Sequence, residues 1–293
     1  MRSSTAPPSL RSPHRCPPVP RLRTASSSSD RRDWVTLRAQ LADFVPLEHH
    51  AQCAFVTDFD GTLSRIVDDP AHAAAVPEAM DALRTLAAHL GLVAVISGRP
   101  VDFLRQHVPI DNVAMVGQYG LERLVDGRVV VDPLALEHVD AMNAALVDAE
   151  RHWPTLLVER KGDIAFALHW RMTPDDEPNP DDLLTLARDH GLSAFPAKMA
   201  FELRPPVAVD KGVAFTELAG GYRYRAFAGD DHSDVAVFTT EFDGSRAPVR
   251  IAVRSDETPP QLIELADVVV DGPEGFAAML TELADAVSSS AQP

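Results

Sequence analysis

A short apolar run that ends in two carboxylates determines how this sequence is interpreted. Residues 54–62 read Ala-Phe-Val-Thr-Asp-Phe-Asp-Gly-Thr, so Asp58 and Asp60 come directly after the run. Such a run is typical of a buried parallel strand, and open α/β sheets bind ligands at the carboxyl ends of these strands. Two carboxylates this close raise each other's pKa unless a cation lies between them. Alone, the motif also matches an acidic turn, but the pair indicates a divalent metal site or a nucleophile beside a proton-transfer group.

The length and composition fit a globular protein with an acidic body. With 293 residues and 45% hydrophobic content, the chain can form one large or two modest domains. The net charge is −16, and residues 1–32 contribute +6 through seven arginines and one aspartate, which leaves −22 for the remainder. An acidic body argues against nucleic acids and anionic membranes as partners. No stretch reaches the roughly 18 apolar residues of a spanning helix, so we expect a cytoplasmic protein with a small-molecule partner, and a monomer as its simplest state.

The first 32 residues are predicted to form a disordered tail, because they are rich in Pro, Ser and Arg and lack an apolar core segment. Arg and Ser with almost no acid also suit an organelle transit peptide. Six prolines and the lack of a clear amphipathic helix favour a dispensable extension or a mis-assigned upstream start. The two cysteines, Cys16 and Cys53, suggest neither a disulfide framework nor a zinc site.

Strand and helix patterns alternate at both ends of the remaining chain, which predicts a parallel sheet with right-handed crossovers. The predicted strands lie at 54–58, 92–96, 113–116, 225–228, 249–253 and 267–270, and the predicted helices at 34–44, 77–90, 100–107, 209–218, after 234 and from 273. The central segment differs, because it has a hairpin signal at Asp126-Gly127 and alternating strand patterns between helical ones. The sequence predicts an α/β protein: a Rossmann-like core of residues 33–120 and 208–293, with an α+β unit of residues 121–207 inserted into it.

Polar groups follow three of the predicted parallel strands. Asp58 and Asp60 follow the first, Ser97 follows the second, and residues 229–234 read Gly-Asp-Asp-His-Ser-Asp after a third. Lys211 opens a helix near the same edge of the sheet. Each piece alone matches a turn, a surface lysine or an acidic helix start, but four in this order argue against coincidence. The set predicts a phosphoryl-transfer site, because that chemistry needs charge neutralisation and positioning above all.

These residues suggest specific roles in a two-step hydrolysis. Asp58 attacks phosphorus to form an aspartyl-phosphate. Asp60 protonates the leaving oxygen and later takes a proton from the attacking water. Ser97 and Lys211 hold the phosphoryl oxygens.

An all-oxygen metal site accompanies this assignment. The expected Mg²⁺ ligands are Asp58, the main-chain carbonyl of Asp60, and Asp230, because Mg²⁺ prefers oxygen ligands and keeps several waters. Asp231 or Asp234 is expected to support the metal through hydrogen bonds without coordinating it.

The four motifs resemble those of the haloacid dehalogenase superfamily of phosphatases, and residues 50–290 resemble its trehalose-6-phosphate phosphatase family. The more specific resemblance lies in the inserted unit, at Glu159-Arg-Lys161, His169-Trp-Arg171 and Glu202-Leu-Arg204-Pro205. It implies that this unit is a cap over the active site, and that the enzyme hydrolyses trehalose 6-phosphate to trehalose and phosphate with Mg²⁺. The substrate-binding residues that the resemblance implies are Gly61, Thr62, Gly98, Arg99, Glu159, Lys161, His169, Arg171, Lys198, Glu202 and Arg204.

The positions of the lysines also favour this resemblance. Only three of the 27 basic residues are Lys, and all three fall in these motifs: Lys161, Lys198 and Lys211. Two departures from the family pattern stand out. Ser233 and Val235 replace the usual Thr and Glu of the last motif, and residues 117–120, Gly-Gln-Tyr-Gly, differ from a frequent His-Gly form. The alternatives left open are a phosphatase of sucrose phosphate or mannosyl phosphoglycerate, a sugar-phosphate mutase, and a non-catalytic sensor.

Overall fold

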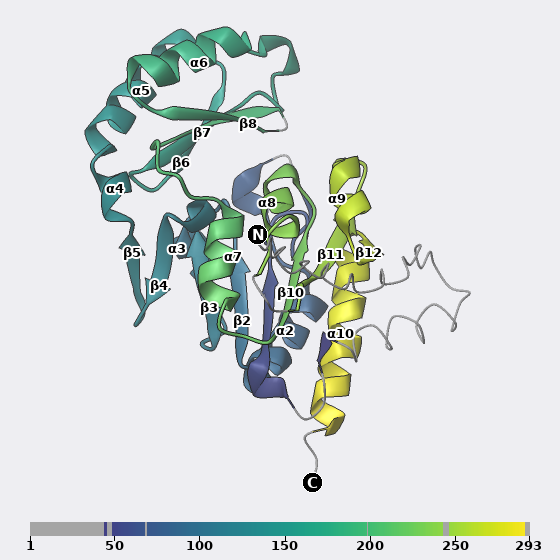
Figure 1. Cartoon of the computed structure of the whole chain (residues 1–293). Coiled ribbons are helices and arrows are strands. Elements are labelled where there is room, and N and C mark those ends of the chain that lie inside the picture. The colour runs from purple at the N-terminus through teal and green to yellow at the C-terminus, as the bar shows by residue number, and fades with distance from the viewer. Residues whose placement is uncertain (1–43, 46–48, 68, 198, 243–245, 291–293) are drawn as a thin grey trace, which may run out of the picture.

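The computed structural model describes residues 44–45, 49–67, 69–197, 199–242 and 246–290 (Figure 1). The predicted tail of residues 1–32, most of the predicted helix at 34–44, and Lys198 lie outside this described part of the chain. Among the described residues, no helix combines the length and apolar character needed to cross a bilayer.

An eight-stranded sheet forms the centre of the molecule, with the strand order β12-β11-β10-β1-β2-β3-β4-β5 (Figure 1). The first six strands in this order are mutually parallel, and β4 and β5 are antiparallel additions at one edge. The strands are β1 (Cys53–Thr57), β2 (Leu92–Ile96), β3 (Val113–Gly117), β4 (Glu122–Val125), β5 (Arg128–Val131), β10 (Tyr224–Gly229), β11 (Val249–Arg254) and β12 (Val268–Asp271). The predicted α/β class with a parallel sheet is confirmed.

Helices cover both faces of this sheet. One face is packed by α2 (Pro77–His89), α3 (Val101–His107) and α10 (Gly272–Ser290). The other is packed by α7 (Lys211–Ala219), α8 (Val235–Phe238) and α9 (Pro260–Leu265). Because both faces are buried, the parallel strands read as nearly continuous apolar runs rather than as alternating ones.

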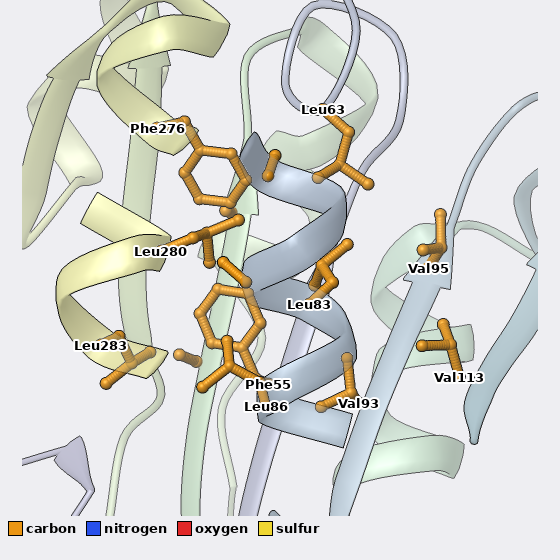
Figure 2. Close-up of a cluster of buried hydrophobic side chains, with 14 of the residues drawn as sticks. Phe55, Leu63, Leu83, Leu86, Val93, Val95, Val113, Phe276, Leu280 and Leu283 are labelled. Carbon is orange, nitrogen blue, oxygen red and sulfur yellow. The ribbon is translucent and has the colours of Figure 1, made fainter. Parts of the chain in front are cut away.

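Strand β1 shows how its side chains divide between the two cores. Phe55 points to the first face, where Leu83 of α2 and Leu280 of α10 pack around it, as Figure 2 shows. The neighbouring Val56 points to the other face and packs with Phe227. Each such fully buried side chain contributes roughly 1.5–3 kcal/mol relative to exposure. This two-sided burial fixes β1, and with it the position of the carboxylates that follow.

A second, four-stranded antiparallel sheet lies between β5 and β10 in the chain, with the order β6-β7-β9-β8. We call residues 133–204 the inserted unit. Figure 1 shows α5 and α6 on the side of this sheet away from the large sheet. Its elements are α4 (Pro133–Leu136), α5 (Val139–His152), β6 (Leu157–Lys161), β7 (Ala165–His169), α6 (Pro180–Asp189), β8 (Ser193–Ala197) and β9 (Ala200–Arg204).

Alternation along these strands separates an apolar face from a polar one. Phe166 and Leu168 of β7 and Leu203 of β9 pack against the helices α5 and α6. The residues of opposite parity therefore face away from those helices. In register across the sheet, Glu159 pairs with Ala167, Ala167 with Glu202, and Glu202 with Phe195. The result is a polar row in which a small alanine lies between two glutamates.

Five single-turn helices complete the described elements: η1 (His50–Gln52), η2 (Pro70–His72), η3 (Gln118–Gly120), η4 (Pro174–Asp176) and η5 (His232–Asp234). The structure differs from the predictions in two places. The sequence predicts the hairpin β4–β5 to be part of an insertion of residues 121–207, but Val116 pairs with Arg123, so the hairpin extends the large sheet. Helix α9 is not predicted at all.

Candidate active site

The parallel register brings the strand ends that carry polar groups together. Strand β1 lies between β10 and β2, with Thr57 opposite Ala228 and Val95. The amide of Asp58 continues this ladder by donating to the carbonyl of Ala228 at 2.8 Å. Asp58, Ser97 and Asp230 therefore follow three adjacent strands at one edge of the sheet.

Asp58 is buried, with both carboxylate oxygens engaged. Its Oδ1 accepts from the amide of Phe59 at 2.6 Å, and its Oδ2 lies 2.7 Å from Lys211 Nζ. Burial raises the pKa of Asp58 to about 6, even though the Lys211 charge acts in the opposite direction. The carboxylate is thus fixed in orientation and little solvated, as a nucleophile requires.

Lys211 is the first residue of α7 and is fully buried. Asp210 caps this helix by accepting from the amide of Val213 at 2.9 Å, which places Lys211 at its start. Lys211 Nζ donates to Asp234 Oδ1 at 2.7 Å and also contacts Asp58. Burial alone lowers the pKa of Lys211, but the surrounding carboxylates outweigh it and hold the pKa well above its usual range. The ammonium therefore stays charged.

The third strand end supplies an acidic cluster. Asp234 Oδ2 accepts from the amides of Asp230 and Asp231, at 2.9 and 3.0 Å. Asp231 in turn accepts from the amide and hydroxyl of Ser233. The Thr62 hydroxyl donates to Asp230 Oδ1 at 3.0 Å. Thr62, predicted at the substrate, thus holds a carboxylate of the cluster.

Asp58, Asp230 and Asp234 fit a cation site. Each offers an oxygen within 4.8 Å of the others. Burial and the neighbouring carboxylates raise the pKa of Asp230 and of Asp234 well above the usual range, so the cluster is short of positive charge despite Lys211. An oxygen-only donor set with excess negative charge matches a hard divalent cation. Asp234 is already tied to the ammonium and two amides, which suits the predicted supporting role.

Two glycines allow this packing. Gly61 has φ +73°, and a side chain there would overlap the carboxylate of Asp230. At Gly229, a side chain would overlap the carboxylate of Asp234. Both glycines therefore make room for the acidic residues. Gly61 was predicted to contact the substrate, but it lies against the carboxylate of Asp230.

The segment after β2 connects the two units. Ser97 is buried, and its Oγ accepts from the amide of Arg99 at 3.2 Å. The Arg99 guanidinium holds both oxygens of Asp60, at 2.7 and 2.9 Å, and donates to Glu159 Oε1 of the inserted unit at 2.8 Å. Because bidentate guanidinium–carboxylate pairs fix geometry, Arg99 orients Asp60. Arg99, which was predicted to bind the substrate, thus binds two carboxylates, those of Asp60 and Glu159.

Glu159 extends this connection, because its Oε2 lies 2.9 Å from His169 Nε2. Burial alone raises the pKa of Glu159, but the His169 hydrogen bond and the charges of Lys161 and Arg99 outweigh it and lower the pKa to about 2. Glu159 is therefore a carboxylate held by donors from both units.

A second cluster of the inserted unit surrounds Glu202. Lys161 Nζ donates to Glu202 Oε2 at 2.7 Å, and the hydroxyl of Tyr119 donates to the same oxygen at 3.1 Å. The guanidinium of Arg204 lies over the rings of Tyr119 and Phe195, at 4.1 and 3.5 Å from their centroids. Five predicted residues lie on the polar face of the small sheet: Glu159, Lys161, His169, Glu202 and Arg204.

One cavity of about 490 Å³ lies between the two units. Its volume is within the range of small-molecule sites. The sheet edge lines it with Asp60, Arg99, Lys211, Asp230 and Asp231, and the inserted unit lines it with His169, Arg171, Phe195, Glu202 and Arg204. Predicted residues of both the sheet edge and the inserted unit thus line one cavity, whereas Asp58, Ser97, Glu159 and Lys161 are not among its lining residues.

Some of its walls were not predicted from the sequence. Glu257, in the loop after β11, lies 3.8 Å from Arg171 across the cavity. Tyr119 was noted only as a departure from a family pattern. Phe195 lies in a predicted strand, but only the structure shows that its side chain, which is 41% exposed, lines the cavity. None of these positions carries a local sequence signal.

The fold is haloacid dehalogenase-like: a parallel sheet whose first strand ends in Asp-x-Asp, with an acidic cluster and a lysine at the same edge. A solved haloacid dehalogenase-like hydrolase from Bacteroides thetaiotaomicron shares this fold, with a TM-score of 0.56 and 13% identity over 78% of this chain and 98% of that one. Within this class, the chain belongs to the trehalose-phosphatase family, whose model matches residues 56–261.

Similar proteins carry related names. An uncharacterized glycosyl hydrolase of Mycobacterium tuberculosis is 36% identical over 222 residues, which are 70% of this chain but 16% of that protein, so this chain spans only about a sixth of its length. A probable trehalose-phosphate phosphatase of Sinorhizobium fredii is 34% identical over 64% of this chain and 73% of its own length. The crystal structure of a trehalose-6-phosphate phosphatase related protein gives a TM-score of 0.66 at 22% identity, and covers 80% of this chain and 99% of that one.

Proposed function

We propose that this protein hydrolyses trehalose 6-phosphate to trehalose and inorganic phosphate. The observation that carries the proposal is the cavity in which Lys211 and the acidic cluster face the polar side of the inserted unit. The first end suits a phosphate group, and the second suits a polyhydroxylated sugar. The inserted unit acts as a cap in this proposal. Membership of the trehalose-phosphatase family supports the choice of sugar.

The first step is attack by Asp58 on phosphorus, which forms an aspartyl-phosphate and breaks the bond to the sugar oxygen. Lys211, 2.7 Å from Asp58 Oδ2, offsets the negative charge around the phosphoryl group. Asp60 gives its proton to the leaving oxygen. Because Arg99 engages both oxygens of Asp60 in this structure, one of these hydrogen bonds has to open when Asp60 carries the proton.

The second step returns the enzyme to its starting state. A water gives a proton to Asp60 and attacks phosphorus, the bond to Asp58 breaks, and phosphate leaves. The proton that Asp60 donated is thereby replaced, and no other reactant is needed. The cap limits access of bulk water while the phosphoenzyme forms.

We propose Mg²⁺ as the cofactor, held by Asp58, Asp230 and the main-chain carbonyl of Asp60, with Asp231 and Asp234 in support. The oxygen-only donors and the shortage of positive charge around Asp230 support this choice. When bound, the ion neutralises charge on the phosphoryl oxygens.

Phosphate release from a panel of substrates tests the proposal. The panel contains trehalose 6-phosphate, sucrose 6-phosphate, mannosyl-3-phosphoglycerate, glucose 6-phosphate and p-nitrophenyl phosphate, each with Mg²⁺ and with a chelator. We expect the highest kcat/KM for trehalose 6-phosphate, one unphosphorylated sugar as product, and loss of activity with the chelator. A clear preference for another sugar phosphate, a rearranged sugar phosphate as product, or no turnover at all rejects the proposal.

A further inference from the structure

Tyr119 connects the two ends of the cavity. Its hydroxyl donates to Glu202 Oε2 at 3.1 Å, on the oxygen that Lys161 Nζ also binds at 2.7 Å. The other oxygen, Glu202 Oε1, is buried and has no hydrogen-bond donor among the described residues. One side of this carboxylate is therefore saturated by the protein, and the other is unpaired.

The ring of Tyr119 supports a second unpaired group. The Arg204 guanidinium is held between the rings of Tyr119 and Phe195, at 4.1 and 3.5 Å from their centroids. Arg204 Nε is buried without an acceptor among the described residues, and it lies 4.0 Å from Glu202 Oε1. Buried polar groups without partners are uncommon and call for an explanation. An unpaired donor beside an unpaired acceptor matches a hydroxyl group, which can accept from one and donate to the other.

Tyr119 is itself anchored at the phosphate end. Its amide donates to the carbonyl of Ser97 at 2.9 Å, and the amide of Gln118 donates to the carbonyl of Arg99 at 3.0 Å. Gln118 and Tyr119 have φ angles of 48° and 61°, which non-glycine residues rarely adopt. Gly98 makes room for the ring, because a side chain there would lie 2.6 Å from the Tyr119 hydroxyl. The strained turn therefore fixes Tyr119 relative to the catalytic strand end.

We propose that Tyr119 is a positioning residue that sets selectivity for the sugar, by holding Glu202 and Arg204 so that their unpaired atoms receive one hydroxyl of the leaving group. This inference rests on the proposed sugar phosphatase function. Burial and the charge of Glu202 raise the pKa of Tyr119 well above its usual range, so its hydroxyl remains a donor at working pH. Tyr119 lines the cavity from the large-sheet side, whereas Glu202 and Arg204 belong to β9. The contact thus also sets the place of the cap residues relative to the phosphate end.

Tyr119→Phe tests this role, because it removes the hydroxyl and keeps the ring under Arg204. We expect KM for trehalose 6-phosphate to rise about tenfold with kcat within about twofold, and the ratio of kcat/KM for the sugar phosphate to that for p-nitrophenyl phosphate to fall by about the same factor. Tyr222→Phe is the matched control, since the Tyr222 hydroxyl donates to the Gly91 carbonyl at 3.0 Å outside the cavity. It should change neither KM nor the ratio.

A double-mutant cycle separates positioning from a general structural role. Glu202→Gln alone should raise KM about a hundredfold, and adding Tyr119→Phe to it should change KM by less than about twofold, because the hydroxyl acts through Glu202. Tyr119→Leu, which also removes the ring, should raise KM for trehalose 6-phosphate more than Tyr119→Phe does.

The outcomes distinguish two failures. If the wild-type enzyme prefers a sugar phosphate but Tyr119→Phe keeps its KM and its selectivity ratio, the inference about Tyr119 is overturned while the proposed function stands. Full additivity of Tyr119→Phe and Glu202→Gln overturns it as well. If the wild type shows no preference for any sugar phosphate over p-nitrophenyl phosphate, the proposed function fails and this inference fails with it.

Discussion

The two ends of the cavity are built on different principles. At the phosphate end, Lys211, Asp58 and Asp234 form a buried network in which no buried side-chain polar atom lacks a partner within the described part of the chain. At the sugar end, Glu202 and Arg204 each keep one buried polar atom without a partner there. The first end is organised before a ligand arrives and lacks only positive charge, whereas the second leaves hydrogen bonds for the ligand to make. Changes at the first should therefore lower kcat and stability, and changes at the second should raise KM.

The largest effect is expected for Asp58→Asn, which keeps the shape of the nucleophile and removes its charge. We expect kcat to fall by at least about 10⁴-fold, because the covalent step is lost. Substrate affinity, measured by calorimetry, should remain, since the sugar end is untouched. Asp81→Asn, at an exposed carboxylate paired with Arg84, is the control and should keep full activity. Substantial turnover by Asp58→Asn would show that hydrolysis is not covalent.

Lys211→Met should come next, because it leaves the carboxylates of Asp58 and Asp234 buried without their ammonium. Breaking a buried pair by removing one partner costs about 3–5 kcal/mol. We expect a loss of this size in the free energy of unfolding, measured by urea denaturation without Mg²⁺, together with a fall in kcat of about 10³-fold. A free energy of unfolding within about 1 kcal/mol of wild type would mean that Lys211 does not compensate the charges of Asp58 and Asp234.

Lys161→Met is the matched substitution at the sugar end, since Lys161 is also a buried lysine in a carboxylate pair. We expect KM for trehalose 6-phosphate to rise by about 30-fold while kcat stays within about threefold, because Lys161 contacts Glu202 and not the groups proposed to react. Steady-state kinetics on both lysine variants makes the comparison direct. If Lys161→Met lowers kcat as strongly as Lys211→Met, the two ends do not differ in the way proposed.

Glu159→Gln should have the smallest effect, visible in the pH dependence of stability. The pKa of Glu159 is lowered from 4.5 to about 2, so its ionised form stabilises the folded state above pH 4.5 and this contribution is lost as the pH falls toward 2. Allowing for partial solvent screening, wild type should lose about 1–2 kcal/mol more than Glu159→Gln between pH 5 and pH 3. Urea unfolding of both proteins at these two pH values measures this. Parallel curves would contradict the assigned pKa.

The sequence predicts those parts of the site whose signals are local. An apolar run followed by carboxylates identifies Asp58, Asp60 and Asp230, because a strand pattern and its polar end lie within a few residues. The register of parallel strands then brings them together without further information. Glu159 and Glu202 of the inserted unit are predicted through the family resemblance instead.

Features that depend on distant partners are not predicted. The hairpin turn at Asp126-Gly127 is correctly located, but alternation does not reveal which sheet a hairpin joins, and β4 pairs with β3. Helix α9 spans six residues, too few to show a helical period. The strained backbone of Gln118 and Tyr119 is held by hydrogen bonds from their amides to the carbonyls of Arg99 and Ser97, respectively, and such distant contacts leave no signal in the local sequence.

The central claim is that Asp58 carries the phosphoryl group during turnover. Rapid acid quenching of the enzyme with trehalose 6-phosphate and Mg²⁺, followed by peptide mass spectrometry, tests it most directly. We predict a phosphorylated peptide that contains Asp58, formed no later than free phosphate and missing from Asp58→Asn. Release of phosphate with no phosphoryl group on the protein, or with one on a different peptide, would contradict the claim.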